Sequence, residues 1–417
     1  MPRTFNQAGD EAVPICQRCS KAQRYCDRTA PVPEFHNRSH EDVAKTDGTT
    51  RYFHHYIVHI APWYDLSDAA ATFATKLPEA SLELDLPFSA ILALAAVHMS
   101  QTSTPSARTA AEFYHGHCVR LLIGLTAEDY GDEGTQGLAL ASVCLLRSYE
   151  ILTGHVLTPT EEVDPNIHLQ GAYSLAAYRS PLTDDLGSGL GAAGFWNYLR
   201  EDITFSLFRR CPLKIDLDHV SLPTQHGTDQ DRLNTVSLIL GRIINACFSS
   251  TITNEAWTLL FGMLRDWRSN LPPRFNPFAK ADRGIGLALP SIPAALHYEL
   301  VSTTLLCTRA TPGRLPGLRA WLEDRAAAAI TKQDMLETLA LDVCGVAFTA
   351  DAPAVQVNAF GPIAFCARFL RAEPARQELV RRLLACKRTI GWPVQRLVAD
   401  LEAECRGSVA RAVGDDE

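Results

Sequence analysis

Apolar residues recur at helical spacing along most of the chain from Arg51 onward. Residues 88–100 are apolar on nearly every side, which predicts a helix at the centre of the fold. A second apolar stripe repeats every three or four positions and consists of Trp196, Leu199, Ile203 and Leu207, with Phe205 and Phe208 widening it. This dominant helical period predicts an all-α fold.

The C-terminal region carries a further helical signal at Pro393, a residue suited to the first turn of a helix. Trp392 is placed to pack just before that helix, whose apolar face is expected to consist of Val394, Leu397, Val398 and Leu401. Residues 213–217 form the only alternating run that suggests a strand, and the run is short. The chain shows no internal repeat and no sustained heptad pattern.

Polar sequence separates the N-terminus from the helical region. Residues 29–50 include Pro31 and Pro33 among many polar residues, a composition typical of a linker. Three parts are therefore expected, namely a cysteine-containing segment over residues 1–28, the linker over 29–50, and one large helical domain over 51–417.

The composition excludes some classes of protein. An apolar content of 47% among 417 residues is enough for a large core, and a net charge of −8 argues against a molecule that binds polyanions over its whole surface. The best apolar run, residues 86–99, is shorter than the roughly 20 residues that span a bilayer. It also contains Pro87 and His98, so a buried helix is expected. Apart from three near the N-terminus, the 12 cysteines are scattered through apolar stretches, which indicates free thiols in a reducing, intracellular compartment.

Three N-terminal cysteines carry the clearest chemistry. Cys16, Cys19 and Cys26 stand in a C-x2-C-x6-C pattern. Two thiolates at the first spacing can hold one zinc ion, and the third can close on the same ion. A structural zinc site has four ligands, so these three are incomplete by themselves. His36 or His40 is an alternative fourth ligand, and a degenerate motif with free surface thiols is a further alternative.

Four cations lie among and beside these cysteines, namely Arg18, Lys21, Arg24 and Arg28. They can contact the phosphate backbone of DNA, or they can form an ordinary solvated turn. Because so few cations release few counterions, any DNA affinity that they provide should be low at physiological salt. The sequence leaves both alternatives open.

Residues 189–194 match the pattern G-x-G-x-x-G. A dinucleotide site would require a strand before this pattern and an acidic residue on a second strand about 20 residues later. Here polar sequence precedes the pattern and an aromatic-rich helix follows it. We therefore expect a flexible loop over residues 181–194 that leads into a helix and binds no nucleotide.

Histidines recur at spacings that could hold a metal ion, in two groups formed by His54, His55 and His59 and by His115 and His117. No carboxylate at a helical offset accompanies either group, so the histidines are expected to be ordinary core or surface residues.

An α-helical enzyme of the terpene-cyclase type is the alternative from another class. Such an enzyme needs carboxylate-rich motifs on facing helices to hold magnesium and a diphosphate. No third carboxylate follows Asp184 and Asp185 at the required turn, and Asn234 is followed by Arg242 where an acid would be needed. No catalytic residue and no cofactor-binding residue is therefore assigned.

Several stretches resemble the helical regulatory domain of fungus-specific transcription factors, and the cysteine segment resembles half of a fungal binuclear zinc cluster, the Zn2Cys6 module. Their order and spacing carry the resemblance more than any single stretch does. The stretches are Tyr52–Leu66 (YFHHYIVHIAPWYDL), His168–Leu175 (HLQGAYSL), Gly194–Leu217 (GFWNYLREDITFSLFRRCPLKIDL), Trp257–Pro277, which ends in WRSNLPPRFNP, and Phe360–Glu402, which contains CKRTIGWPVQRLVADLE.

The cysteine segment departs from the family pattern. A complete cluster has two C-x2-C-x6-C halves whose six thiolates hold two zinc ions, whereas residues 16–26 supply one half. The resemblance places the helix that reads bases mainly in the other, first half. Two explanations are expected: the first half is encoded upstream of Met1, or the protein has lost it.

The resemblance implies a transcriptional regulator in a fungal nucleus, with zinc in the complete cluster, DNA as a partner and no membrane association. A homodimer or transcriptional cofactors are further expected partners. The alternative is a regulator that lacks its own DNA reader and acts through protein partners. For the chain as it stands, DNA binding is expected to be weak or absent.

Overall fold

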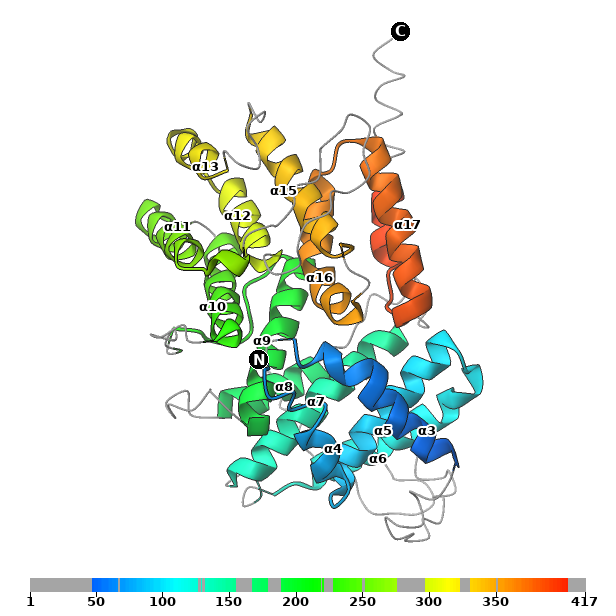
Figure 1. The fold of residues 1–417 in the computed structure, drawn as a ribbon. Coiled ribbons are helices and arrows are strands. Elements are labelled where there is room, and N and C mark those ends of the chain that lie inside the picture. The colour runs from blue at the N-terminus through cyan, green and yellow to red at the C-terminus, as the bar shows by residue number, and fades with distance from the viewer. Residues whose placement is uncertain are drawn as a thin grey trace, which may run out of the picture. The chain divides into compact units, whose positions relative to one another are not determined.

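The computed structural model describes residues 47–403, except for residues 67, 127–128, 130–131, 155–166, 179–188, 219, 221–227, 250–251, 276–296, 323–330 and 350–351. Its contacts divide the chain into residues 1–47 and residues 48–417. Every regular element in the described part of the second unit is a helix (Figure 1), so the predicted all-α fold is confirmed. The cysteine segment and most of the predicted linker lie outside the described residues, and the three-part domain division stays a prediction.

The helices fall into two groups that meet at α9 (Gly189–Arg209). The first group comprises α3 (Asp47–His55), η2 (Tyr56–Ile60), η3 (Ala61–Trp63), α4 (Lys76–Ser81), α5 (Asp85–Thr102), η4 (Pro105–Ala107), α6 (Arg108–Gly124), α7 (Glu133–Gly154) and α8 (Ile167–Tyr178). The second group comprises α10 (Asp229–Phe248), α11 (Asn254–Ser269), η6 (Pro273–Phe275), α12 (His297–Thr308), η8 (Pro312–Arg314), α13 (Leu315–Trp321), α15 (Lys332–Val346), α16 (Pro353–Cys366), η9 (Ala367–Phe369), α17 (Glu373–Ile390) and a last helix over residues 395–403.

Helix α9 connects the two groups. It packs against α7 and α8 on one side and against α10 and α16 on the other (Figure 1). In the first group α5 packs between α6 and α7, and in the second α12 packs against α10 and α15. Helix α9 therefore contributes buried side chains to the packing of both groups.

The two strongest sequence predictions concern α5 and α9. Every residue from Pro87 to Met99 in α5 is buried, which confirms the central helix. The predicted stripe of α9 is also confirmed, because the side chains of Trp196, Leu199, Ile203 and Leu207 are all at most 5% exposed. Phe208 is 47% exposed, so the prediction that it widens the stripe was wrong. It lies in the last turn of α9.

Residues 213–217 do not form a strand. Their alternation is real, since Leu213, Ile215 and Leu217 are buried while the residues between them are not. Their amides bond to side chains, because Asp202 Oδ2 accepts from the amides of Lys214 (2.9 Å) and Ile215 (3.0 Å). Side-chain acceptors from α9 and α10 thus take the place of a neighbouring strand.

The C-terminal helix begins at residue 395, just beyond the predicted start at Pro393. The amide of Val398 donates to the carbonyl of Val394 (2.9 Å), so the chain between them turns into the helix. Trp392 packs where expected, stacked on Phe360 with ring centroids 5.6 Å apart. Gly391 adopts a left-handed conformation (φ 71°) that ends α17 and lets the chain turn back.

Candidate functional site

The predicted zinc and DNA residues lie outside the described residues. They are Cys16, Cys19 and Cys26, the cations Arg18, Lys21, Arg24 and Arg28, and the alternative ligands His36 and His40. Zinc ligation and phosphate contact by these side chains stay predictions. Within the described ranges of residues 47–403, no group of three or more His, Cys, Asp or Glu side chains could hold a metal ion.

The histidines form pairs across helices. His55 Nε2 lies 2.8 Å from His98 Nδ1, and His115 Nε2 lies 2.9 Å from His168 Nε2. One ring of each pair donates and the other accepts, so each bond requires at least one neutral imidazole. Burial, and after it the charge of the neighbouring histidine, lowers the pKa of His98 to about 3 and that of His115 to about 4. These four histidines therefore join helices, as expected for core residues.

The glycine pattern over residues 189–194 is not a loop. It forms the first turns of α9, and Gly191 and Gly194 are buried. A Cβ atom added to Gly137 of α7 would lie 2.9 Å from the backbone nitrogen of Gly191, and one added to Gly194 would lie 3.0 Å from Leu140. The glycines thus permit a close approach of α7 and α9, and the prediction of a loop up to residue 194 was wrong.

A cavity of about 170 Å³ lies between the N-terminal half of α9 and the turn that follows Trp63. It is called the α9 pocket here. Its lining residues are Tyr64, Asp68, Ala69, Ala70, Thr72, Gly189, Ala192, Ala193, Trp196, Asn197, Arg200 and Gln230. Arg200 and Asn197 are 3% and 6% exposed, whereas Ala69, Ala70 and Gly189 are exposed. The pocket therefore has a buried floor and an open rim.

The floor of the α9 pocket is polar. Arg200 Nη2 donates to Asn197 Oδ1 (2.8 Å) and to the carbonyl of Tyr64 (3.2 Å). Asn197 Nδ2 donates to the same Tyr64 carbonyl (3.0 Å) and to the carbonyl of Ala193. Burial lowers the pKa of Arg200, an effect opposed by several neighbouring groups that include Glu201 and Asp65. These bonds fix the direction of a buried guanidinium beside the cavity.

The turn over residues 64–74 forms the opposite wall, and two aspartates hold its backbone. Asp65 accepts from the amides of Phe73 and Ala74, both at 2.9 Å. Asp68 accepts from the amides of Ala70 (3.0 Å) and Thr72 (2.8 Å). Ala71, which lies between Ala70 and Thr72, has a left-handed backbone (φ 49°), a conformation that costs free energy for a residue with a side chain. Such conformations concentrate at functional sites, where surrounding contacts maintain them.

The rim is closed on one side by α10. Gln230 Oε1 accepts from the amide of Ala69 (2.9 Å) and so joins the first turn of α10 to the turn after Trp63. Thr228 and Asp231 form a capping box at this end of α10, each side chain accepting from the other residue's amide. Gln230 therefore lies within the turn that Thr228 and Asp231 cap.

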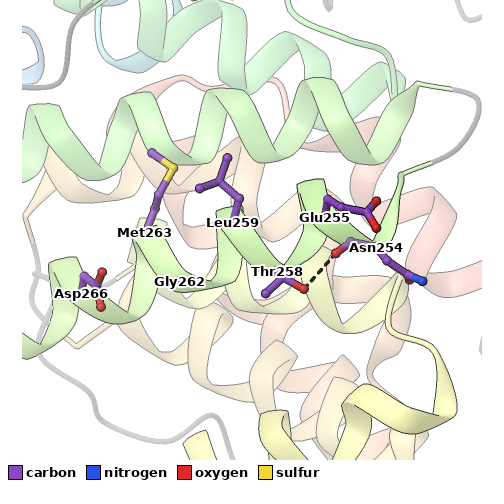
Figure 2. Close-up of a pocket in the computed structure, with 7 residues that line it drawn as sticks. All are labelled: Asn254, Glu255, Thr258, Leu259, Gly262, Met263 and Asp266. Carbon is purple, nitrogen blue, oxygen red and sulfur yellow. Dashed lines mark hydrogen bonds between the residues drawn. The ribbon is translucent and has the colours of Figure 1, made fainter.

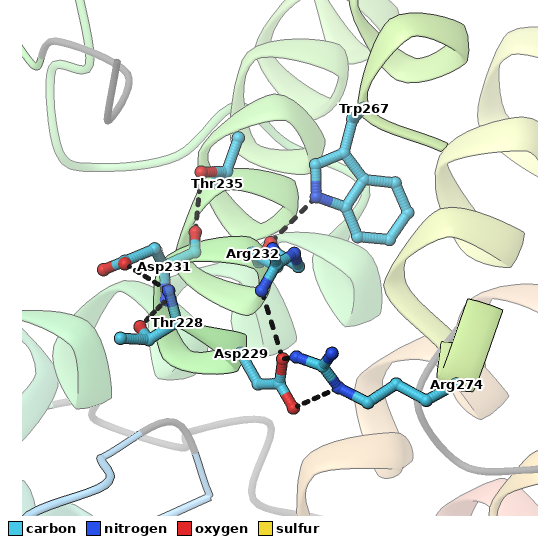
Figure 3. A network of polar contacts seen from close by, with 7 residues as sticks. All are labelled: Thr228, Asp229, Asp231, Arg232, Thr235, Trp267 and Arg274. Atoms are coloured by element: carbon cyan, nitrogen blue, oxygen red, sulfur yellow. Dashed lines mark hydrogen bonds and ion pairs between the residues drawn. The ribbon is translucent and has the colours of Figure 1, made fainter. Parts of the chain in front are cut away.

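Further contacts anchor the same end of α10 (Figure 3). Asp229 accepts from Arg232 Nη1 (3.2 Å) and pairs with the Arg274 guanidinium, whose Nε donates at 3.3 Å. Trp267 Nε1 of α11 donates to the carbonyl of Arg232 (2.9 Å). The N-terminus of α10 is thus tied to α11 and to η6, which keeps the rim of the α9 pocket in place.

A second hollow is an open strip along α11. Figure 2 shows its lining residues, Asn254, Glu255, Thr258, Leu259, Gly262, Met263 and Asp266. All belong to α11, and Leu259 is 65% exposed. The Thr258 hydroxyl donates to the carbonyl of Asn254 (2.8 Å), a bond within the helix. No described residue of another element forms a second wall, so the strip is a weaker candidate than the α9 pocket.

Sequence reasoning missed the α9 pocket. Its floor residue Arg200 follows Leu199 inside the apolar stripe of α9. An arginine at such a position is rarely buried without a partner, and it could have indicated a buried polar site. The other lining residues, in the turn over residues 64–74 and at Gln230, are distant from Arg200 in the sequence, and no local sequence pattern predicts that they lie beside it. None of the described helices combines the length and apolar composition that crossing a bilayer requires.

Comparison with known families concerns the region that builds most of this pocket. Residues 51–200 match the model of the fungal specific transcription factor domain. The match supports the regulatory domain of a fungal transcription factor for this region, and it includes every residue that lines the α9 pocket except Gln230. Comparisons with curated proteins and with solved structures found no match. The later stretches that carry the resemblance, Trp257–Pro277 and Phe360–Glu402, lie beyond the matched residues.

Proposed function

We propose that the chain is a fungal transcriptional regulator whose helical unit is the regulatory part. The match of residues 51–200 to the fungal specific transcription factor domain is the observation that carries this proposal. The helical fold supports it, because the matched residues share one interior with the helices that follow them. A nuclear location follows from the same function.

DNA binding is proposed to come from the zinc-cluster half at Cys16, Cys19 and Cys26 once a first half completes it. The cysteine spacing and the four nearby cations support this part of the proposal. The competing proposal is a regulator without its own reader, which reaches DNA through a partner subunit or transcriptional cofactors.

A terpene-cyclase-type enzyme gains no support from α10. Arg242, which stands where that chemistry would need an acid, donates to the carbonyl of Val220 (2.8 Å). Asn234 is 3% exposed inside the same helix. Both side chains therefore serve the packing of α10, and the family match likewise favours a protein that is not an enzyme.

The test titrates the purified full chain, with zinc present, against random-sequence duplexes and duplexes that contain CGG, at physiological salt. We expect weak binding with little sequence preference, because four cations give few phosphate contacts and a shallow dependence on salt. Adding a first zinc-cluster half upstream should produce selective binding to paired half-sites if the protein dimerises.

The control for this titration carries serine at Cys16 and Cys19. If the extended chain binds DNA no better than this control, the zinc-cluster proposal fails and the partner-dependent regulator is favoured. Tight, sequence-selective binding by the unextended chain would contradict the view that the present cysteine segment is an incomplete reader.

A further inference from the structure

The C-terminal end of α9 gathers two phenylalanines and three cations. Phe208, which is 47% exposed, and the half-buried Phe205 lie three residues apart and are therefore neighbours on the helix surface. Arg209 follows Phe205 by four residues, which places it beside the same ring. The Nζ atom of Lys214 lies 5.3 Å from the centre of that ring. These four residues, together with Arg210, are called the Phe208 patch here.

Two contacts bring Lys214 back against α9. The Cys211 amide donates to the carbonyl of Ser206 (3.3 Å), which turns the chain at the end of the helix. Asp202 Oδ2 accepts the Lys214 amide (2.9 Å) and fixes the returning segment on α9. The patch is therefore built on a helix and on a segment that is anchored to it.

Arg210 has a left-handed backbone (φ 55°) directly after the last residue of α9. Glycine is the usual residue at such a place, because it adopts this conformation without steric cost. An arginine there costs free energy that the helix end does not require, and such conformations concentrate at functional sites. Arg209 and Arg210 are both exposed, and within the described part of the chain neither side chain has a hydrogen bond or an ion pair.

We propose that the Phe208 patch is a docking surface for an acidic peptide segment of a partner protein, one that carries apolar side chains between its carboxylates. The apolar side chains would pack on Phe205 and Phe208, and the carboxylates would pair with the guanidinium groups around them. Arginine suits this role because its planar fork binds a carboxylate through two hydrogen bonds. Apolar anchors surrounded by such pairs are typical of the centre of protein interfaces.

The charge around the patch favours a short acidic segment over a nucleic acid. Asp216 and Asp218 are exposed shortly after Lys214 and would repel a longer phosphate backbone. The buried Asp202 carboxylate also attracts Lys214 and offsets part of its charge. The two arginines therefore supply most of the attraction, and two guanidinium groups match a few carboxylates better than a polyanion. The net charge of the chain, −8, adds repulsion for a polyanion.

The test is fluorescence anisotropy of a labelled peptide of three Asp-Asp-Leu-Phe repeats, titrated with the full chain at physiological salt. One matched probe has asparagine in place of every aspartate, and another has alanine in place of every leucine and phenylalanine. We expect each matched probe to bind at least about tenfold more weakly, because the first loses the charge-assisted hydrogen bonds and the second loses the apolar contact. Higher salt should weaken binding of the acidic peptide.

Two variants locate the surface. Arg210→Gly removes one cation and relieves the left-handed backbone, so it should weaken peptide binding about twofold to fivefold without lowering the melting temperature. Phe208→Ala removes the exposed ring and should weaken binding at least about fivefold. The matched controls are Arg265→Ala and Leu259→Ala in α11, where the side chain of Arg265 is 59% exposed and Leu259 is 65% exposed. Both controls should bind the peptide as the wild type does.

Circular dichroism and the melting temperature establish that each variant is folded before its affinity is compared. Lack of binding of the acidic peptide overturns the proposal, as does equal binding of the asparagine probe. Undiminished binding to folded Phe208→Ala and Arg210→Gly variants also overturns it. If a random-sequence duplex displaces the labelled peptide at a lower concentration than the unlabelled peptide does, the patch binds nucleic acid and the proposal is wrong. Peptide binding does not depend on the zinc-cluster proposal, so the two can fail separately.

Discussion

Replacing Gly361 by alanine should lower the free energy of unfolding by about 1–3 kcal/mol, the usual cost of adding a carbon to a filled core. A Cβ atom at this position would lie 2.7 Å from the Cα atom of Thr204 and 3.2 Å from its Cβ atom. Because Thr204 belongs to α9 and Gly361 to α16, the contact cannot be relieved by rotating one side chain. The two helices must separate, and the buried residues around them lose contact.

The matched control is Gly262→Ala in α11, where a new Cβ atom would meet no atom within 4 Å beyond the neighbouring backbone of its own helix. This substitution should raise the stability by about 0.5–1 kcal/mol, because alanine loses less backbone entropy than glycine in a helix. Urea-unfolding midpoints of both variants give the comparison. Equal midpoints would contradict the close packing of α9 against α16.

Replacing Asp202 by alanine should lower the free energy of unfolding by about 2–4 kcal/mol, because each buried donor left without an acceptor costs about 1–3 kcal/mol. Asp202 Oδ2 is the acceptor for the amides of Lys214 and Ile215 and lies 3.3 Å from the Tyr198 hydroxyl. Without this carboxylate the amides of Lys214 and Ile215 lose their acceptor, while the amide of Leu213 keeps Asn245 Oδ1. Asp216→Ala, at an exposed position of the same segment, should have a much smaller effect.

The charge of Asp202 gives this prediction a dependence on pH. Burial raises the pKa of Asp202 to about 6, and its Oδ1 atom accepts no hydrogen bond from the described residues. The folded state therefore takes up this proton at a higher pH than the unfolded state, whose carboxyl has an ordinary pKa. The Asp202 contribution to stability is thus largest at low pH and falls as the pH rises through 6.

The Asp202→Asn variant tests this sign. Asparagine keeps one acceptor oxygen for both amides and does not titrate. The difference in the free energy of unfolding between the variant and the wild type therefore reports the protonation of the Asp202 carboxyl group. Lowering the pH from 7 to 5 should stabilise the wild-type protein relative to Asp202→Asn in urea unfolding. An unchanged difference between the two proteins would show that the carboxyl group of Asp202 titrates normally.

The sequence predicted the elements whose signals are local. The apolar character of residues 88–100 is a signal within α5, and the stripe that begins at Trp196 is a signal within α9. Residues 88–99 and the stripe residues Trp196, Leu199, Ile203 and Leu207 are buried as expected. The strand suggested by residues 213–217 failed for a tertiary reason. Side chains from α9 and α10 accept the amides of these residues, and no local period contains that information.

The candidate site was the part that the sequence predicted least. The α9 pocket requires the carbonyl of Tyr64, the Arg200 guanidinium and the side chain of Gln230 at one place, and these residues lie far apart along the chain. The pairing of His115 with His168 was missed for the same reason, because sequence spacing had suggested His117. Tertiary packing brings such distant side chains together, whereas the local periodicity of the sequence predicts only the helices on which they lie.

The regulatory role is tested most directly by recruiting the full chain to a reporter promoter through fusion to an unrelated DNA-binding domain. This arrangement supplies the DNA contact and leaves the helical unit as the variable. The account predicts that the fusion changes transcription several-fold, in either direction, relative to the DNA-binding domain alone. It also predicts that Asp202→Ala reduces this change while the Asp216→Ala control keeps it. Reporter transcription that is unchanged by the folded, promoter-bound wild-type fusion would contradict the account.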